Sequence, residues 1–517
     1  MQLQFAAYLK IGKSKLKSFF SQIGKNILPG LIVSIILPLT GSAQVSSPEE
    51  QNQPATSQLP ELGDSAAQYL TPIQEKDIGQ QFQRQLLRAR SYIGDPEIRA
   101  YLSDLGREIA QYADLFDLQP EFNLIQDKEL NAFAVPGGFI TFNSGLILAT
   151  DSENELAAVV GHEIAHLAQR HLPRLIARSE ANKLPAAAAI LASVLVGGQA
   201  GLAGLTLANA QLLSNQLAYT REFETEADAL GIRYLAAAGY SPHAMAGFFS
   251  KIERYSRAQS EQSREFLRTH PLSYVRIAES ESRAARYDSA QKPPPRDDLP
   301  YLMVKAKLRA LYQDRSLLEN NRIHFLSIIE NSTGRDKAVA HYGLGLTLSQ
   351  MRQFESAHMH MDQAIALIPD QLAFQIGKAY IEIADGNSSA AVARLESVYE
   401  KSKSPAYLVF YLADAFLADG QAEQAKRLVR YQLRRDRDDF RLYRPLSKAN
   451  VALGALSEAH QADAEYLAAQ GGYKGAVASL KLAIREAGDN NYLNQSLKAR
   501  LKDLEIKLSA QNRRGGN

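Results

Sequence analysis

A repeat in the last third of this 517-residue chain restricts its fold more than any other feature. Four alanines, each inside a helix-like pattern of apolar residues, recur at intervals of 34 residues: Ala357, Ala391, Ala425 and Ala459. Small residues at fixed positions let paired helices approach closely, and one such pair buries its apolar face only by stacking on its neighbours. We therefore expect residues 299–510 to form an α-solenoid rather than an unspecialised helical bundle.

The clearest copy of the repeat spans residues 338–371 and places Gly345, Ala357 and Ala364 ahead of Pro369. It resembles the tetratricopeptide repeat, a helix-turn-helix unit. Stacked repeats of this kind present a concave surface on which peptides dock. Residues 299–510 are therefore expected to bind proteins, and residues 511–517 are expected to be a disordered tail.

Chemistry is indicated by the pattern H-E-x-x-H, formed by His162, Glu163 and His166. Residues four apart lie on one face of a helix, so the two histidines can hold one metal ion. Glu163 would then stand beside the ion, where it can accept a proton from water. Apolar residues on both sides predict a buried helix. A pair of buried histidines that are only hydrogen-bonded is the alternative that this short pattern leaves open.

The chain contains no cysteine, so histidine, aspartate and glutamate must supply any transition-metal ligands. A catalytic zinc site has three protein ligands and one open position. Glu224 and Asp228 are four residues apart and are interleaved with Phe223 and Ala227, which favours one buried acidic stripe over a solvated face. Glu224 can complete the ligand set. Asp228 can accept a hydrogen bond from a ligand histidine and orient it.

The two segments together resemble a family of zinc peptidases that includes the CAAX prenyl protease and bacterial membrane-protein quality-control proteases. The family pattern is H-E-x-x-H followed by E-x-x-A-D, which Glu224 and Asp228 match and Glu226 does not. The resemblance implies one Zn²⁺ per chain, with His162, His166 and Glu224 as ligands and Glu163 and Asp228 as catalytic residues. It also implies a mostly α, zincin-like metallopeptidase domain with a small β-hairpin or sheet, here residues 70–288.

Two further passages match the family. The first begins at Asn131 with N-A-F-A-x-P-G-G and continues into the β-rich run Phe139–Phe142. An exposed strand edge here could hold an extended peptide by main-chain hydrogen bonds, and a plain core hairpin is the alternative.

The second passage is Thr269-His270-Pro271, just before a helix-like segment. The resemblance leaves His270 two roles: it can occupy the fourth position on zinc and keep the enzyme inactive, or it can hydrogen-bond the developing oxyanion. A loop residue that caps a helix is the third interpretation. His171 lies five residues past His166, off that helix face, and is interpreted as structural.

The remaining segments predict export and flexible joints. Residues 1–43 have a basic start, an apolar stretch and small residues before Ala43, which predicts a signal peptide cleaved near Ala43. An uncleaved membrane anchor is the alternative, although the apolar stretch is short for a span. Residues 44–69 are expected to be a flexible linker, and the proline-rich residues 289–298 a boundary. Residues 184–220 carry no charge, which favours a helical element over the cleft, with membrane contact as the alternative.

Export, peptidase motif and repeats together resemble family members that act in the periplasm on outer-membrane proteins. The resemblance implies a zinc-dependent endopeptidase that degrades misfolded or stalled β-barrel precursors, has chaperone-like activity, and docks on the β-barrel assembly machinery through its repeats, with peripheral membrane association. The near balance of 58 basic and 56 acidic residues gives no electrostatic basis for nucleic-acid binding. The alternative is a proteolytically silent periplasmic chaperone or adaptor that acts through the repeats.

Overall fold

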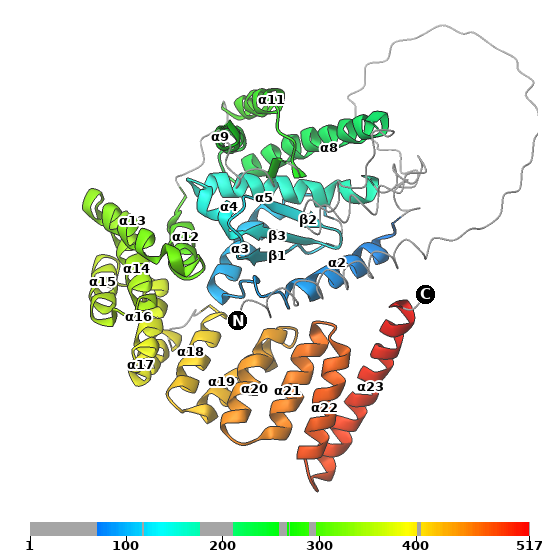
Figure 1. The fold of residues 1–517 in the computed structure, drawn as a ribbon, viewed down its shortest axis with the longest axis vertical. Coiled ribbons are helices and arrows are strands. Elements are labelled where there is room, and N and C mark those ends of the chain that lie inside the picture. Colours follow the sequence, from blue (N-terminus) through cyan, green and yellow to red (C-terminus); the bar gives the residue numbers. More distant parts are fainter. Residues whose placement is uncertain are drawn as a thin grey trace, which may run out of the picture.

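A computed structural model describes seven segments of the chain. They are residues 70–115, 118–175, 210–257, 266–267, 269–288, 296–400 and 405–515. The expected signal peptide and linker, residues 1–69, lie outside these segments, as do most of 184–220 and most of the proline-rich boundary. Figure 1 shows a helical body with one small sheet and, below it, an arc of helix pairs. The predicted class, a mostly α metallopeptidase-like domain followed by a helical solenoid, is confirmed.

The N-terminal body is built from helices around a three-stranded sheet. Its elements are α2 (Pro72–Leu86), α3 (Pro96–Ala110), β1 (Glu121–Ile125), β2 (Ala132–Val135), β3 (Phe139–Asn143), α4 (Ser144–Ala149), α5 (Glu153–Ala168), α8 (Ala210–Ala237), α9 (Ala244–Arg257), α11 (Tyr274–Ala284) and η4 (Ala285–Tyr287). Short polar side chains start several of these helices. Asp95 accepts hydrogen bonds from the first turn of α3, and Ser152 does so for α5.

The sheet has the strand order β1-β3-β2. β2 and β3 form an antiparallel hairpin, as the run Phe139–Phe142 predicts, and β1 pairs in parallel with β3. The hairpin turn places Gly137 and Gly138 at φ +87° and +95°, a region that side-chain-bearing residues rarely adopt. β3 is buried throughout and lies between the other two strands, which leaves β1 and β2 as the edge strands.

Helix α5 is the centre of the body. Its run Leu156–Val160 is apolar on every face, and all five side chains are buried. α5 packs against α8 on one side and against α3, α9 and β2 on others. The motif histidines therefore sit on a helix most of whose residues are buried.

The solenoid consists of consecutive antiparallel helix pairs. Its elements are α12 (Leu299–Leu311), η5 (Arg315–Leu317), α13 (Leu318–Asn331), α14 (Gly334–Gln350), α15 (Phe354–Leu367), α16 (Leu372–Ala384), α17 (Ser388–Tyr399), α18 (Leu408–Ala418), α19 (Ala422–Arg435), η6 (Phe440–Leu442), α20 (Tyr443–Ala452), α21 (Leu456–Ala469), α22 (Tyr473–Glu486) and α23 (Asn491–Gly515).

The four repeat alanines confirm the predicted period. Each is the fourth residue of the second helix in its pair, and each is at most 1% exposed: Ala357, Ala391, Ala425 and Ala459. The turn between the helices of a pair repeats with the same period, because a left-handed residue closes the first helix each time. These residues are Arg352, Gly386, Gly420, Gly454 and Gly488.

The chain end differs from the expected disordered tail. α23 continues through Gly515, so most of residues 511–517 is helical. Gln511 Nε2 donates a hydrogen bond to the carbonyl of Gly471 at 3.3 Å, which ties this last helix to the turn before α22.

The solenoid contacts the N-terminal body near both of its ends. Lys307 of α12 is buried and lies 2.8 Å from both Asp95 and Glu97 at the start of α3, and its Nζ donates to the hydroxyl of Tyr411 on α18. Farther along, Arg88 donates to the carbonyl of Gln470 at 3.1 Å. The arc of repeats is therefore in contact with the N-terminal body at two places along its length (Figure 1).

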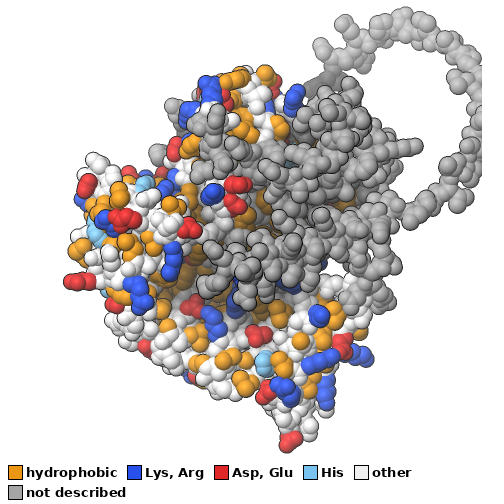
Figure 2. All heavy atoms as spheres, in the orientation of Figure 1, with side chains coloured by type: hydrophobic (Ala, Val, Ile, Leu, Met, Phe, Trp, Pro, Cys, Tyr) orange, Lys and Arg blue, Asp and Glu red, His pale blue; other side chains and the backbone are white. Residues whose placement is uncertain are grey.

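The face in Figure 2 shows acidic and basic side chains interspersed over the repeats. Among the residues that the structure describes, no helix combines the length and the apolar character needed to cross a membrane.

Candidate active site

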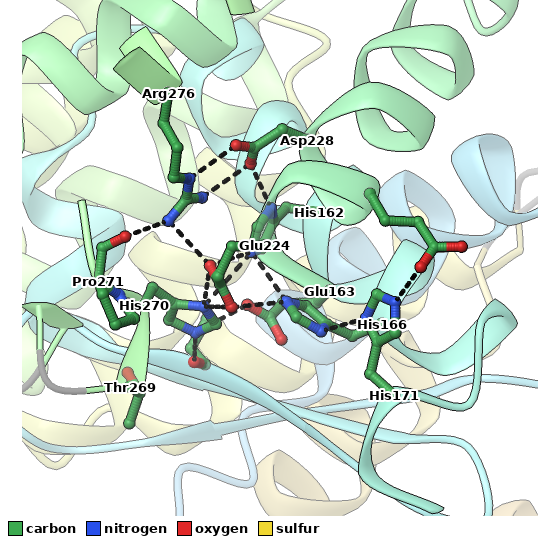
Figure 3. Close-up of polar contacts among 12 residues, drawn as sticks. His162, Glu163, His166, His171, Glu224, Asp228, Thr269, His270, Pro271 and Arg276 are labelled. Atoms are coloured by element: carbon green, nitrogen blue, oxygen red, sulfur yellow. Dashed lines mark hydrogen bonds and ion pairs between the residues drawn. The ribbon is translucent and has the colours of Figure 1, made fainter. Parts of the chain in front are cut away.

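Three elements bring four side chains to one point. α5 supplies His162 and His166, α8 supplies Glu224, and the segment before α11 supplies His270 (Figure 3). One nitrogen or oxygen from each of the four lies within 4.8 Å of every other, which is the spacing of a metal-ligand set. Three of the four side chains are buried, and His166 is partly exposed.

The two motif histidines face each other across one turn of α5. Their Nε2 atoms are 3.0 Å apart, as the i, i+4 spacing predicts. Glu163, between them in sequence, is 1% exposed, and its Oε1 forms no hydrogen bond among the described residues, although Nε2 of His270 lies 3.5 Å away. A buried carboxylate oxygen without a partner is costly in a folded protein, so this atom is available for a substrate or water.

The two carboxylates of α8 reach the histidines from the opposite side. Glu224 lies 3.4 Å from Nε2 of His162 and 3.3 Å from Nε2 of His166. One turn later, Asp228 lies 3.0 Å from the other ring nitrogen of His162, its Nδ1. The shared face predicted for Glu224 and Asp228 therefore points at the histidine pair.

His270 enters the same pocket. Its Nδ1 lies 3.1 Å from Glu224 and 3.3 Å from Nε2 of His162, and its Nε2 lies 3.3 Å from the carbonyl oxygen of Ala132 on β2. The side chain thus bridges the ligand cluster and the edge strand of the sheet.

Arg276 of α11 has a larger part in the site than its place in the sequence indicates. Its guanidinium donates twice to Asp228, at 2.8 Å each, and Nη1 lies 3.0 Å from Glu224. It also lies over the ring of Phe249, 4.8 Å from the centroid. Arg276 is a buried arginine beside two buried carboxylates, and the sequence gives one indication of this: its position in the helix after Thr269-His270-Pro271.

His171 is the residue whose position the helix pattern misjudges. α5 ends at Ala168, and Arg170 adopts a left-handed conformation with φ +49°, so the chain turns before His171. The turn brings Nδ1 of His171 to 2.8 Å from Nδ1 of His166. An uninterrupted helix would have carried His171 off that face, which is why the sequence alone places it away from the site.

The electrostatics of the pocket favour a positive charge at its centre. Burial opposes ionisation of Glu224, but His270, His162 and His166 outweigh it and hold its pKa well below the usual value. Burial likewise opposes a charge on His162, yet hydrogen bonds and charges from Asp228 and Glu224 raise its pKa to about 10. The pocket therefore stabilises either a proton or a metal ion between these groups.

The donor set fits a divalent transition metal. Imidazole nitrogens together with one carboxylate suit zinc, whereas magnesium and calcium prefer oxygen ligands throughout. The cluster as it stands offers His162, His166 and Glu224 as ligands, with His270 near enough to act as a fourth.

Comparisons with known proteins show which proteins this chain is similar to. The model of Peptidase family M48 matches residues 96–284. A beta-barrel assembly-enhancing protease of Yersinia pestis is 31% identical over 442 residues, which cover 84% of this chain and 89% of that protein. The protein of the same name from Escherichia coli (strain K12) is 28% identical and covers 90% and 93%.

More distant similarity is confined to parts of the chain. A mitochondrial metalloendopeptidase of Schizosaccharomyces pombe is 32% identical over 181 residues, 35% of this chain and 51% of that one. A solved tetratricopeptide repeat protein from Parabacteroides merdae covers 52% of this chain and 99% of its own, with 13% identity and a TM-score of 0.27. The near full-length matches and the M48 region together show that this chain is a metalloprotease and belongs to the beta-barrel assembly-enhancing protease family.

Proposed function

We propose that this chain is a zinc-dependent endopeptidase in which His162, His166 and Glu224 hold the metal ion. The observation that carries the proposal is the convergence of their ligand atoms in a buried pocket that stabilises positive charge. Zinc bound there would polarise the carbonyl of the scissile peptide bond and make a water molecule more acidic. The domain limits expected from the sequence, residues 70–288 for the peptidase and 299–510 for the repeats, are part of this proposal.

Glu163 is the proposed general base. Glu163 is on the same helix as two of the ligands, and its Oε1 forms no hydrogen bond among the described residues. Glu163 takes one proton from the attacking water and passes it to the leaving amine, while the water oxygen bonds to the carbonyl carbon and the C–N bond breaks. Asp228 accepts the Nδ1 hydrogen of His162, so that Nε2 faces the ion.

His270 is proposed to cover the site. It lies as near to Glu224 and His162 as a fourth ligand would, and its contact with Ala132 occupies a carbonyl of edge strand β2. An extended substrate would pair with such an edge. The other role, donation to a developing oxyanion, makes the opposite prediction for removal of the side chain.

We propose that the chain works in the setting that its relatives' names describe. Exported to the periplasm after cleavage near Ala43, it would degrade misfolded or stalled outer-membrane β-barrel precursors. It would dock on the β-barrel assembly machinery through its repeats, with a chaperone-like activity and peripheral contact with the membrane. The near full-length similarity supports this setting. Extended segments of an unfolded β-barrel precursor are also the kind of segment that edge strand β2 can pair with.

The replacement Glu163→Gln tests the proposal. With the full-length protein and an unfolded outer-membrane β-barrel protein as substrate, we expect cleavage to fall at least about 100-fold, because a general base contributes about 10²–10⁴. Bound zinc and the unfolding temperature should stay at wild-type values. Cleavage by the variant at the wild-type rate would contradict the mechanism.

The same variant addresses the alternative of a silent adaptor. In cells that lack the protein and show a defect in outer-membrane assembly, Glu163→Gln should restore assembly only in part. Full restoration would mean that the repeats do the work without proteolysis.

A further inference from the structure

We infer that His171, backed by Glu226, is a positioning residue for His166: its Nδ1 accepts the Nδ1 hydrogen of His166 and so holds the Nε2 of His166 toward the metal. The inference rests on the proposed function, in which His166 is a zinc ligand. It assigns a role to two side chains that the family pattern leaves without one.

The contacts link three side chains in a series that leads away from the ligand cluster: His166, His171 and Glu226. Nδ1 of His171 is 2.8 Å from Nδ1 of His166, and Nε2 of His171 is 3.2 Å from Glu226 (Figure 3). The side chain of His171 is only 5% exposed, so water does not compete freely for these contacts.

The placement of hydrogens follows from the metal. Two ring nitrogens 2.8 Å apart share one hydrogen, so one is the donor and the other the acceptor. If Nε2 of His166 offers its lone pair to the ion, the hydrogen of His166 is on Nδ1. His171 is then the acceptor through Nδ1 and carries its own hydrogen on Nε2, which points at the carboxylate of Glu226. This arrangement gives each ring nitrogen of His166 and His171 a partner.

Further contacts restrain His171 and Glu226, the second and third side chains of this series. The ring of His171 stacks on Phe223 with a centroid distance of 4.6 Å and an interplanar angle of 17°. Arg174 donates a hydrogen bond to Glu226 at 3.0 Å, and its guanidinium lies over the ring of Phe223, 4.7 Å from the centroid. His171 is thus fixed in ring plane and in rotation.

The two histidine ligands are therefore supported in different ways. His162 has an anionic partner, Asp228, in direct contact, whereas His166 has a neutral ring whose carboxylate stands one step farther away. Partners of this kind change metal affinity by about 10–100-fold when they are removed.

The test measures zinc binding by chelator competition with the full-length protein. His171→Leu keeps apolar bulk but removes the acceptor, whereas His171→Asn retains an acceptor oxygen near the position of Nδ1. We expect His171→Leu to raise the Kd for Zn²⁺ by about 10–100-fold, and His171→Asn to leave it within about threefold of wild type. His243→Leu is the control, because both ring nitrogens of His243 also have hydrogen-bond partners, but His243 lies outside the ligand cluster.

A second variant guards against misfolding. Glu226→Leu changes a side chain that is 34% exposed. We expect it to raise the Kd for Zn²⁺ as well, but by less than His171→Leu does. The absorption spectrum of the Co²⁺-loaded protein should change for His171→Leu and remain like wild type for His171→Asn.

Two results would overturn the inference. One is wild-type zinc affinity in His171→Leu. The other is equal weakening in His171→Leu and His171→Asn, since the lost acceptor would then not be the cause. Failure of the proposed function would be seen elsewhere: the wild-type protein would not bind zinc, or Glu163→Gln would still cleave.

Discussion

Gly161 of α5 and Gly231 of α8 meet backbone to backbone beside His162. A Cβ atom on Gly231 would lie 3.2 Å from the carbonyl carbon of Gly161, 3.2 Å from the nitrogen of His162, and 2.9 Å from the methyl group of Met245. A Cβ on Gly161 would lie 3.3 Å from the carbonyl oxygen of Gly231. The absence of a side chain at both residues allows this close approach of the two helices, and the approach lets the carboxylates of α8 reach the histidines of α5.

The first prediction concerns this contact. Gly231→Val should force α8 away from α5, destabilise the protein by about 1–3 kcal/mol through overpacking, and greatly lower zinc content and proteolysis. Gly231→Ala should have a smaller effect of the same kind. Zinc content of the purified variants and urea unfolding measure both consequences.

Gly247→Ala is the control for Gly231→Val. Gly247 is inside α9, and a Cβ there would meet nothing within 4 Å. The change should be neutral or stabilise the protein by about 0.5–1 kcal/mol, since alanine is the better helix former. Full zinc content in Gly231→Val would show that the glycine contact does not set the spacing of the ligands.

Short-range spacing made most of the candidate site predictable. His162 with His166, and Glu224 with Asp228, are pairs four residues apart, and helix geometry alone puts each pair on one face. The meeting of the two faces was expected from the need of a zinc site for a third ligand and from the resemblance to a family, because nothing local in the sequence says that Gly161 will cross Gly231. The 34-residue period of the repeats could be predicted for the same reason, because it is a short-range pattern that recurs at a fixed spacing.

The features that were missed depend on a break in local structure or on distant pairing. His171 reaches His166 because Arg170 leaves the helical conformation, which the residue types around it do not announce. Strand β1 pairs directly and in parallel with β3, although β2 lies between them in the sequence, and a five-residue strand that includes a polar Asn123 gives little sign of this. Such contacts are decided by the whole fold.

The second prediction concerns Arg276. Arg276→Met removes the partner that donates twice to Asp228 and leaves that carboxylate buried at 0% exposure. Breaking one side of a buried ion pair costs about 3–5 kcal/mol, so the metal-free variant should unfold at a clearly lower urea concentration. Zinc should restore part of the loss, because an ion that binds only the folded protein stabilises it.

A double replacement checks the cause. Arg276→Met combined with Asp228→Leu removes both charges, so it should be less destabilised than the sum of the single variants. If the two single effects simply add, the ion pair is not what stabilises this part of the fold.

The third prediction separates the two roles of His270. If His270 covers the site, His270→Ala should raise proteolysis, by up to about tenfold where the covered state makes up nine-tenths of the molecules. If it serves the oxyanion, kcat should fall by about 10²–10³. The contacts with Glu224 and Ala132 favour the rise. Initial rates on an unfolded substrate distinguish the outcomes, with His460→Ala on repeat helix α21 as the control.

The fourth prediction concerns a histidine pair in the first full repeat. His341 of α14 and His360 of α15 stack with ring centroids 5.2 Å apart, and their Nδ1 atoms are 2.9 Å apart. Burial, the neighbouring His360 and the charge of Lys337 lower the pKa of His341 to about 4, and burial lowers the pKa of His360 as well. Both rings are therefore neutral in the folded solenoid at pH 7.

The unfolded chain binds more protons than the folded chain between the ordinary histidine pKa of about 6.5 and about 4, so the free energy of unfolding should decrease as the pH falls through that window and stay level above it. For His341 the loss at pH 4 should be about 1–3 kcal/mol. His341→Gln cannot take up a proton, so its urea midpoint should depend less on pH between 7 and 4.5 than that of wild type. Equal slopes in wild type and His341→Gln would rule out the His341–His360 contact as the source.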